Sequence, residues 1–517
     1  MALEYAQLPD EPEELKQMLL KHSSVVEALR AEVLRLRRWR FGRSSEVIDA
    51  NIAPELPLAG GESTPPAPRQ ELSDPDRPPK LMAVEPVTSK AIQRRPARLL
   101  PPELPRVIKV HPPSRCTCPD CGKQLSRLGE DTSEQLDYVH GYFQVIRHVR
   151  PKLSCGACAK ILQAPAPSRP IERGLPTAAL LAQVVAAKYA DHSPLYRQEG
   201  IYRRSGVELP RAMLASWIAD VAALVEPLVN ALQRYVMCAE KLHADDTPVP
   251  VLSPGRGRTR TGRLWAYVRD DRPCGGTDPP AVVYRYSPDR KAERPREHLR
   301  SFTGILQADA YSGFTPLYAN GKILEAACWA HARRKYYDVY VADRSPIAAQ
   351  ALQRIGELYE IEREIRGRGP AERHAARQTR SVPVLEDLGT WLRATQRTVS
   401  AKSPIAAAIH YTLVRWAALT RHLDDGRIEV DNNAAERAIR ALVLGRRNYL
   451  FTGSDAGGDT AACLYSLIGT CRLNEIDPHL YLRHVLEHIA MHPINRIGEL
   501  LPWRVGPLLP LALSRAA

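Results

Sequence analysis

The 517-residue chain lacks an uninterrupted apolar run that is long enough to cross a membrane. Such a span needs about 18 or more apolar residues, whereas the run AALLAQVVAA occupies only residues 178–187. The N-terminus also lacks the basic start and apolar stretch of a secretory signal, because it carries Glu11, Glu13 and Glu14. Both absences predict a cytoplasmic protein with no membrane partner.

The cysteines lack the distribution expected of a disulfide-stabilised fold. Of ten cysteines, four form the pairs Cys118/Cys121 and Cys155/Cys158, which favours a reducing compartment and a bound metal. Two Cys-x2-Cys pairs supply four thiolates for a tetrahedral structural Zn²⁺ site, and the 33 residues between them can form a hairpin. We therefore expect a zinc-binding module at residues 111–165, with four buried free cysteines as the alternative. Two further donors nearby could replace one ligand: His111 and Cys116.

The composition predicts several modules and a polyanionic partner. A chain of this length is too long for one ordinary core, so three or more modules are expected. The 72 lysines and arginines exceed the 58 acidic residues, and the formal net charge is +14. This surplus suits a polyanion without identifying it.

Residues 1–48 predict a coiled coil with a basic end. Its three-heptad seam, weakened by one histidine, consists of Leu15, Leu19, His22, Val26, Leu29, Val33 and Leu36. We expect this segment to form a homo-oligomer; the alternative is one amphipathic helix packed on its own protein. Five arginines between Arg35 and Arg43 either contact DNA phosphates or lie in solvent. The proline-rich residues 49–110 predict a stiff, partly disordered linker.

Residues 170–236 are expected to be helical. A helix from Leu195 to Ser205, a turn at Gly206 and a second helix from Pro210 are typical of a helix-turn-helix DNA reader, although many helical hairpins share this pattern. Four arginines favour the DNA-binding interpretation: Arg197, Arg203, Arg204 and Arg211.

From residue 240 the pattern changes to strands, and two apolar runs stop at an acid. These acids are Asp245 and Asp309. An apolar run that ends at an acid is typical of a buried strand that places a carboxylate at the edge of a sheet. A third acid, Glu436, follows the N-cap residues Asn432 and Asn433, so it is expected in the first turn of a helix. Two strand-end acids and one helical acid can hold a pair of divalent ions, the arrangement used for in-line phosphoryl transfer.

More than a hundred residues of helical periodicity separate the last predicted strand from Glu436. We interpret residues of about 339–425 as a helical insertion within a catalytic domain at 240–452. The tail, residues 453–517, is expected to be helical.

Taken together, these segments resemble the transposases of the insertion sequence 66 family. The matching segments are HADDTPVPVL (243–252), GRLWAYVRD (262–270), LQADAYSGF (306–314), CWAHARRKYYD (328–338) and DNNAAERAIRALVLGRRNYLFTGS (431–454). RFGRSSE (40–46) and the cysteine module also fit, so the likeness covers nearly the whole chain. The family usually has Asp-Glu-Thr where this chain has Asp245, Asp246 and Thr247.

The resemblance implies a multidomain α/β protein. Its core would be an RNase-H-like mixed sheet with a helical insertion, preceded by a coiled coil, a zinc-binding module and a helical DNA-binding region. The catalytic acids of this Asp-Asp-Glu (DDE) type would be Asp245, Asp309 and Glu436, which bind Mg²⁺ (or Mn²⁺), with Asp245 bridging two ions.

The resemblance also implies an activity. Such a DNA transposase would bind the double-stranded ends of its insertion sequence, cleave them and join the 3′ ends to target DNA. It would work in the cytoplasm at the bacterial nucleoid, with accessory proteins of the same element as further partners.

Two neighbouring features each allow two interpretations. Four arginines beyond Glu436 either hold DNA phosphates or form a salt-bridged helix surface: Arg437, Arg440, Arg446 and Arg447. The pair Cys328-x2-His331 is similar to a signature of several related transposase groups. A second metal site there would need two more ligands that the sequence does not identify, so structural hydrogen bonding is favoured.

Two other functions remain open. One is a metal-dependent DNA nuclease that has the same core but no joining step. The other is a catalytically silent zinc DNA-binding protein, which would have no need of all three acids.

Overall fold

A computed structural model describes residues 100, 104–113, 116–118, 120–121, 123–139, 141–158, 160–172 and 174–510. The expected coiled coil at 1–48 and most of the expected linker at 49–110 lie outside the described residues. The described part contains two mixed sheets and many helices.

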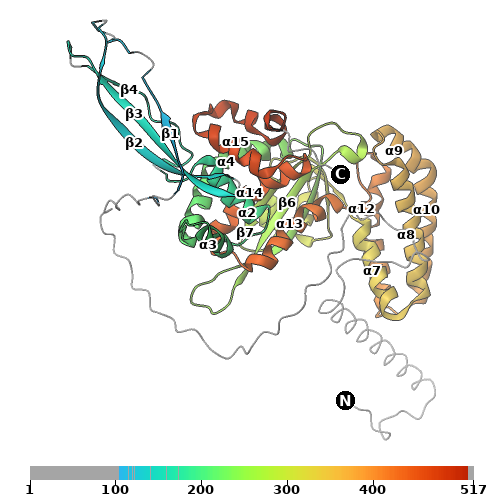
Figure 1. Ribbon diagram of the computed structural model, residues 1–517. Coiled ribbons are helices and arrows are strands. Elements are labelled where there is room, and N and C mark those ends of the chain that lie inside the picture. The colour runs from blue at the N-terminus through green and yellow to red at the C-terminus, as the bar shows by residue number, and fades with distance from the viewer. Residues whose placement is uncertain are drawn as a thin grey trace.

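The first sheet is an arm that projects from the body of the molecule (Figure 1). Its strands are β1 (Arg106–Val110), β2 (Ser126–Val139), β3 (Tyr142–Ser154) and β4 (Ile161–Gln163). The order is β1-β3-β2, with β4 also paired to β3. The long antiparallel hairpin of β2 and β3 turns at Gly141, whose φ of 99° suits a residue without a side chain. β1 occupies the last residues of the segment expected to be linker, because its pairing with β3 holds it in the sheet.

Three helices connect the arm to the body. They are α2 (Ala178–Tyr189), α3 (Leu195–Arg204) and α4 (Arg211–Met237). The turn after α3 contains Gly206 with a φ of 79°, as the glycine in the sequence indicates. Among the described helices, α4 is long and apolar enough to span a membrane by length and composition. The expectation of no such segment missed α4 because Asp220 and Glu226 interrupt its apolar run. Its apolar face packs in the protein core against α14 and β7, as the core helix of a globular protein does.

The central sheet has five strands in the order β7-β6-β5-β8-β9. Their bounds are β5 (Lys241–Val251), β6 (Arg260–Arg269), β7 (Ala281–Ser287), β8 (Gly304–Ala308) and β9 (Ile323–Ala326). β6 is antiparallel to both β5 and β7, whereas β5, β8 and β9 are parallel to one another. Two short helices lie in the connections, α5 (Glu293–His298) and α6 (Thr315–Tyr318). The apolar and alternating segments at 242–244, 263–268, 282–286, 305–308 and 323–327, which the sequence predicts as strands, coincide with these five strands.

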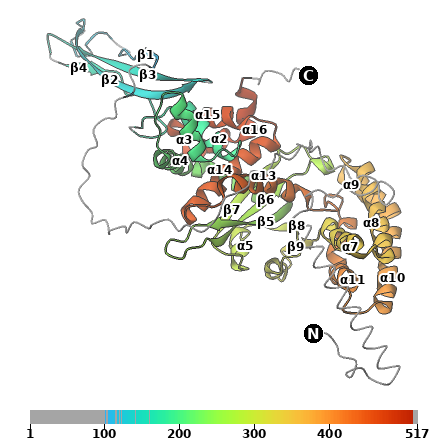
Figure 2. The same ribbon diagram turned by 60° about the horizontal axis from the view of Figure 1, so that its bottom comes forward.

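A helical unit follows β9 and lies beside that end of the sheet (Figure 2). Its helices are α7 (Trp329–Asp343), α8 (Pro346–Ile365), α9 (Pro370–Ala376), α10 (Val382–Thr398), α11 (Pro404–Val414) and α12 (Trp416–Thr420). The unit has its own apolar core. Buried Arg377 donates from Nε and Nη2 to the two oxygens of Glu362, both at 2.7 Å, so the charges inside the unit are paired.

The chain then returns to the central sheet. The remaining helices are α13 (Asn433–Tyr449), α14 (Asp455–Leu473), α15 (Pro478–His488) and α16 (Pro502–Val505). Short 3₁₀ turns complete the chain at Arg272–Cys274, Ser312–Phe314, Arg421–Leu423, Ile489–Met491, Ile494–Leu500 and Gly506–Leu508, and a π-helical turn lies at Arg377–Ser381. α13 packs on β5 and β6, and α14 packs on β7. The hydroxyls of Ser466 and Thr470 on α14 accept from the N–H groups of Tyr284 and Val282, which satisfies backbone groups of this edge strand.

Candidate active site and metal centre

The three acids identified in the sequence come from neighbouring elements. Asp245 lies on β5, and Asp309 directly follows β8. Ala244 pairs with Ala308 in parallel register, so the next residue on each strand emerges at the same place on the sheet. Glu436 lies in the first turn of α13, as predicted, and α13 packs on β5.

The carboxyls of Asp309 and Glu436 are close enough to raise the pKa of Asp245. Burial raises the pKa of Asp245 to about 7, and the negative charges of Asp309, Asp246 and Glu436 add to this rise. Burial also raises the pKa of Asp309, although the Tyr311 N–H and the Arg290 guanidinium oppose the rise. Buried carboxyls with insufficient positive charge nearby are typical of a cation-binding site.

The neighbouring acid Asp246 is neutralised by arginines. Its side chain is 1% exposed, and its two oxygens accept from Arg263 Nη1 at 2.9 Å and from Arg290 Nη2 at 2.7 Å. Arg290 Nη2 also lies 3.5 Å from Asp309 Oδ2. Because Asp246 is already paired, Asp245 is the member of the pair that is suited to bind an added cation.

Cys328 and His331 lie next to Glu436. Cys328 is the N-cap residue of α7 and is buried, and burial raises the pKa of its thiol well above its usual range. His331 Nδ1 lies 3.8 Å from Glu436 Oε1, and the ligand atoms of all three residues lie within 4.8 Å of one another. The sequence did not identify Glu436 as a partner of this pair. The backbone N–H of Asn432 donates to Cys328 Sγ at 3.2 Å, which agrees with the structural hydrogen bonding expected of Cys328.

Asn432 is a buried site residue whose role the sequence did not reveal. Its side-chain N–H donates to the Ala244 carbonyl at 2.9 Å, and its Oδ1 accepts from His243 Nδ1 at 3.0 Å. Its own carbonyl accepts from the N–H of Glu436 at 3.3 Å. Asn432 thus joins the first turn of α13 to the strand residues immediately before Asp245. In the sequence, the position of Asn432 before the predicted helix indicated an N-cap residue, but it did not indicate these contacts with β5.

The arginines of α13 lie along the same helix as Glu436. Arg437, Arg440 and Arg447 are exposed. Arg446 is half-buried and donates to Thr247 Oγ1 at 3.2 Å and to the Pro248 carbonyl. A further arginine reaches this helix from α3, because Arg197 donates to Asn448 at 3.4 Å. These contacts place arginines from two elements at the C-terminal part of α13.

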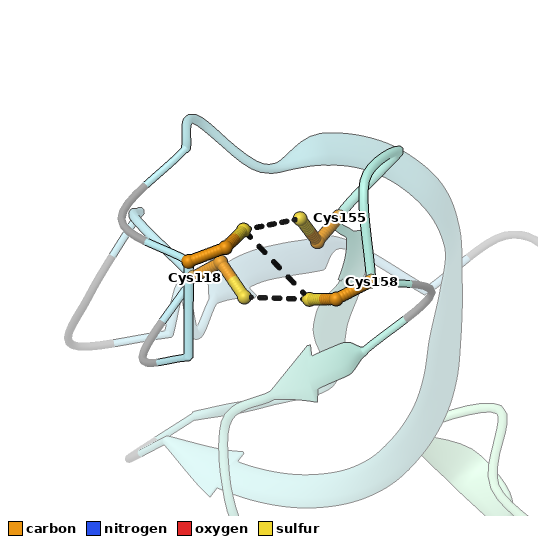
Figure 3. Close-up of side chains that lie close together, drawn as sticks. Cys118, Cys155 and Cys158 are labelled. Atoms are coloured by element: carbon orange, nitrogen blue, oxygen red, sulfur yellow. Dashed lines mark hydrogen bonds between the residues drawn. The ribbon is translucent and has the colours of Figure 1, made fainter.

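The four paired cysteines converge at the end of the arm (Figure 3). The Sγ–Sγ distances are 2.9 Å for Cys118 to Cys158, 3.4 Å for Cys121 to Cys155 and 3.8 Å for Cys121 to Cys158. The N–H groups of Ala157 and Cys158 lower the pKa of Cys155 to about 6, which favours its thiolate.

The two pairs have the same local turn. The Cys118 N–H donates to the Lys123 carbonyl at 2.8 Å, and the Cys155 N–H donates to the Lys160 carbonyl at 2.9 Å. Of the spare donors named above, His111 pairs with His148 at 3.0 Å. Four sulfur ligands in this arrangement fit a structural zinc ion.

Comparison with known protein families agrees with this organisation. The chain matches the model described as Transposase IS66 family over residues 173–460 and the IS66 C-terminal element over 466–503. It also matches the zinc-finger binding domain of transposase IS66 over 115–159, which includes all four cysteines, and Transposase C of IS166 homeodomain over 28–108.

Similar full-length proteins come from Sinorhizobium fredii. The uncharacterized protein y4hP is 40% identical over 494 residues, which cover 92% of this chain and 88% of the relative. The uncharacterized protein y4jD is 39% identical over 515 residues, which cover 97% of this chain and 98% of the relative. The chain therefore belongs to the IS66 transposase family, with zinc-binding and DNA-binding domains.

Proposed function

We propose that the chain is a DDE-type transposase that binds the ends of its insertion sequence, cleaves the DNA and joins the 3′ ends to target DNA. The convergence of Asp245, Asp309 and Glu436 is the observation that carries this proposal. These acids lie far apart in the sequence, yet two of them raise the pKa of the third.

The topology of the central sheet supports an RNase-H-like core. In such a core, three antiparallel strands are followed by two strands parallel to the first, and the first and fourth strands are neighbours. The order β7-β6-β5-β8-β9, with β8 beside β5, has this pattern. The first acid comes from β5, the second from the end of β8 and the third from the helix that packs on β5.

The carboxyls fit a pair of hard divalent ions, Mg²⁺ or Mn²⁺. Asp245 would bridge the two ions, and Asp309 and Glu436 would each hold one. When bound, such ions stabilise charge at the phosphorus and lower the pKa of the attacking oxygen. Burial at Asp245 and Asp309 limits water around the reacting phosphate, which strengthens the interactions of the site.

The arginines of α13 would hold the DNA backbone next to the acids. The exposed guanidiniums of Arg437, Arg440 and Arg447 are suited to phosphate, and Arg446 is fixed by its contacts to β5. The helical region at 170–236, in which α3 and α4 flank a glycine turn, would add a second DNA contact.

The domain plan of the proposal follows the sequence expectation. Residues 1–48 would assemble a homo-oligomer, 111–165 would bind zinc, and 240–452 would form the catalytic domain with its helical insertion. A nucleoid location and accessory proteins of the same element belong to the same proposal.

Three substitutions test the catalytic set. Asp245→Asn, Asp309→Asn and Glu436→Gln should each abolish Mg²⁺-dependent cleavage and joining of DNA that carries the ends of the element. A double variant should resemble a single one, because the acids act as one unit. Binding of the same DNA should persist, since removing a negative charge lowers repulsion of phosphate. Normal cleavage by Glu436→Gln would refute the three-carboxylate mechanism.

The matched control is Asp220→Asn, an exposed carboxylate of α4, which should cleave DNA like the wild type. Asp246→Asn is unsuitable, because it removes the charge and one of the two accepting oxygens that Arg263 and Arg290 contact. Asp246→Ala is a poor control, because it would leave Arg263 and Arg290 without their buried partner. The assay also separates the alternatives. A nuclease would cleave but not join ends with a free 3′-hydroxyl, and a silent DNA-binding protein would do neither.

A further inference from the structure

A second cluster of metal-ligating side chains lies beside the proposed catalytic acids. Cys328 precedes α7, His331 lies in the first turn of α7, and Glu436 lies in the first turn of α13. The cluster therefore combines two elements that are about a hundred residues apart in the sequence. Among the described residues it is one of two such groups, and the other is the four-cysteine centre.

The donor set is that of a zinc site. Thiolate sulfur, imidazole nitrogen and carboxylate oxygen all bind Zn²⁺, whereas a thiolate is a poor ligand for Mg²⁺. Ligands at the usual zinc distances stand about 3.3–3.6 Å apart in a tetrahedron. The 3.8 Å between His331 Nδ1 and Glu436 Oε1 is a few tenths of an ångström longer.

Two local features favour a ligand role. His331 Nδ1 is buried, and it has no hydrogen-bond partner among the described residues. The Asn432 N–H points at Cys328 Sγ, and a hydrogen bond of this kind stabilises a metal-bound thiolate. His331 Nδ1 is thus without a protein hydrogen bond among the described residues, and Cys328 Sγ has a donor that would stabilise it as a metal ligand.

We propose that Cys328, His331 and Glu436 bind a zinc ion with an open fourth position, in addition to the zinc ion of the four-cysteine centre. Three protein ligands and one open position are typical of zinc sites that bind water or a substrate oxygen. The second oxygen of Glu436 is available to the ions of the proposed catalytic site, so this carboxylate can bridge the two sites. That bridging role rests on the proposed function, whereas the zinc site itself does not.

Metal content tests the site. The full-length protein, purified without chelator and measured by inductively coupled plasma mass spectrometry, should contain about two zinc ions per chain. His331→Gln and Glu436→Gln should each reduce this content to about one, as should Cys155→Ser in the other centre, and His331→Gln with Cys155→Ser should leave none. The matched control is His410→Gln, an exposed histidine of α11, which should retain both ions.

Cobalt reports the sulfur ligand directly. In a protein in which Cys118, Cys121, Cys155 and Cys158 are all replaced by serine and which is loaded with Co²⁺, the remaining site should show a thiolate-to-cobalt absorption band, and Cys328→Ser should remove it. His331→Gln serves as a second variant if the buried serine prevents folding. A wild-type content of one zinc, or two zinc ions that His331→Gln leaves unchanged, would overturn the proposal.

Zinc content and DNA cleavage, measured on the same protein, test the zinc site and the proposed function separately. Zinc content requires no DNA, so an absent second ion with intact Asp245-dependent cleavage would refute the zinc site alone. Two zinc ions without such cleavage would refute the proposed function alone.

Discussion

At the residue scale, two adjacent aspartates of β5 have opposite environments. Asp246 is neutralised by two arginines, whereas the pKa of Asp245 is raised to about 7 by burial and by neighbouring acids. The folded protein therefore disfavours the ionised form of the Asp245 carboxyl, and a bound cation would stabilise that form.

This environment predicts a pH-dependent effect of Asp245→Asn on stability. The folded pKa lies above the ordinary value of 3.8, so this carboxyl lowers the free energy of unfolding as pH rises from about 4 to about 7. Asparagine does not ionise, so the Asp245→Asn protein does not lose this unfolding free energy. In Mg²⁺-free buffer, the gain in unfolding free energy should be about 2–3 kcal/mol larger at pH 8 than at pH 5.

Chemical denaturation at the two pH values measures this difference. Asp220→Asn, on the exposed face of α4, is the control and should change stability little at either pH. An equal gain for Asp245→Asn at pH 5 and pH 8 would contradict the environment described for Asp245.

The sequence indicated the candidate acids, and the family resemblance favoured Asp245 over Asp246, but the sequence could not show how the environments of the two differ. Apolar runs that end at Asp245 and Asp309 are visible in the sequence because a buried strand has a local pattern. The pairing of Asp246 depends on Arg290, which lies 44 residues further on. No local pattern specifies such a contact, so the arginines could be found only from the folded chain.

At the element scale, α13 is attached to the central sheet through Asn432. The amide contacts His243 and Ala244 on β5, and the carbonyl accepts the N–H of Glu436. Burial lowers the pKa of His243 to about 4, so its ring is neutral and donates from Nδ1 to the amide oxygen. These contacts join the first turn of α13 to β5, so we expect Asn432 to position Glu436 relative to Asp245.

Asn432→Ala tests this attachment. The substitution removes two buried hydrogen bonds and should lower the unfolding free energy by about 1–3 kcal/mol. It should also lower kcat for DNA cleavage more than it changes the Kd for DNA, because the first turn of α13, with Glu436, loses its attachment while Arg446 still holds the later turns to β5. Asn433→Ala is the control, since Asn433 donates to Asp431 in the same turn, and its effect on kcat should be small. Equal kcat values for the two variants would exclude the positioning role.

The elements were more predictable than their packing. Alternation and apolar runs indicated the five strands, and the two asparagines indicated the start of α13, because these signals are local. β1 was assigned to the linker, since a five-residue strand within a proline-rich segment has little local signal. Its pairing with β3, about 40 residues away in the sequence, stabilises it instead.

At the scale of the whole molecule, the two ends of the arm are stabilised differently. Near the body, Leu136, Phe143 and Val145 belong to the main apolar core. At the far end, the described residues form a buried apolar cluster of Cys118, Leu125 and Cys155, with two partly buried leucines beside it. A cluster of this size is too small to fold a segment by itself, so we expect the far end to depend on zinc held by the four cysteines.

This difference predicts partial unfolding of the arm in Cys155→Ser. Loss of one thiolate should release the zinc ion of this centre, and the far end, about residues 116–125 and 153–163, should lose its structure. The near half of the β2–β3 hairpin should remain folded, because its side chains pack in the main core. Hydrogen exchange measured by mass spectrometry should therefore rise at the far end and stay unchanged in the central sheet. Cys238→Ser, at an exposed cysteine after α4, is the control and should exchange like the wild type. Faster exchange throughout the central sheet would mean that the arm and the body unfold as one unit, and unchanged exchange at the far end would mean that the apolar cluster suffices without zinc.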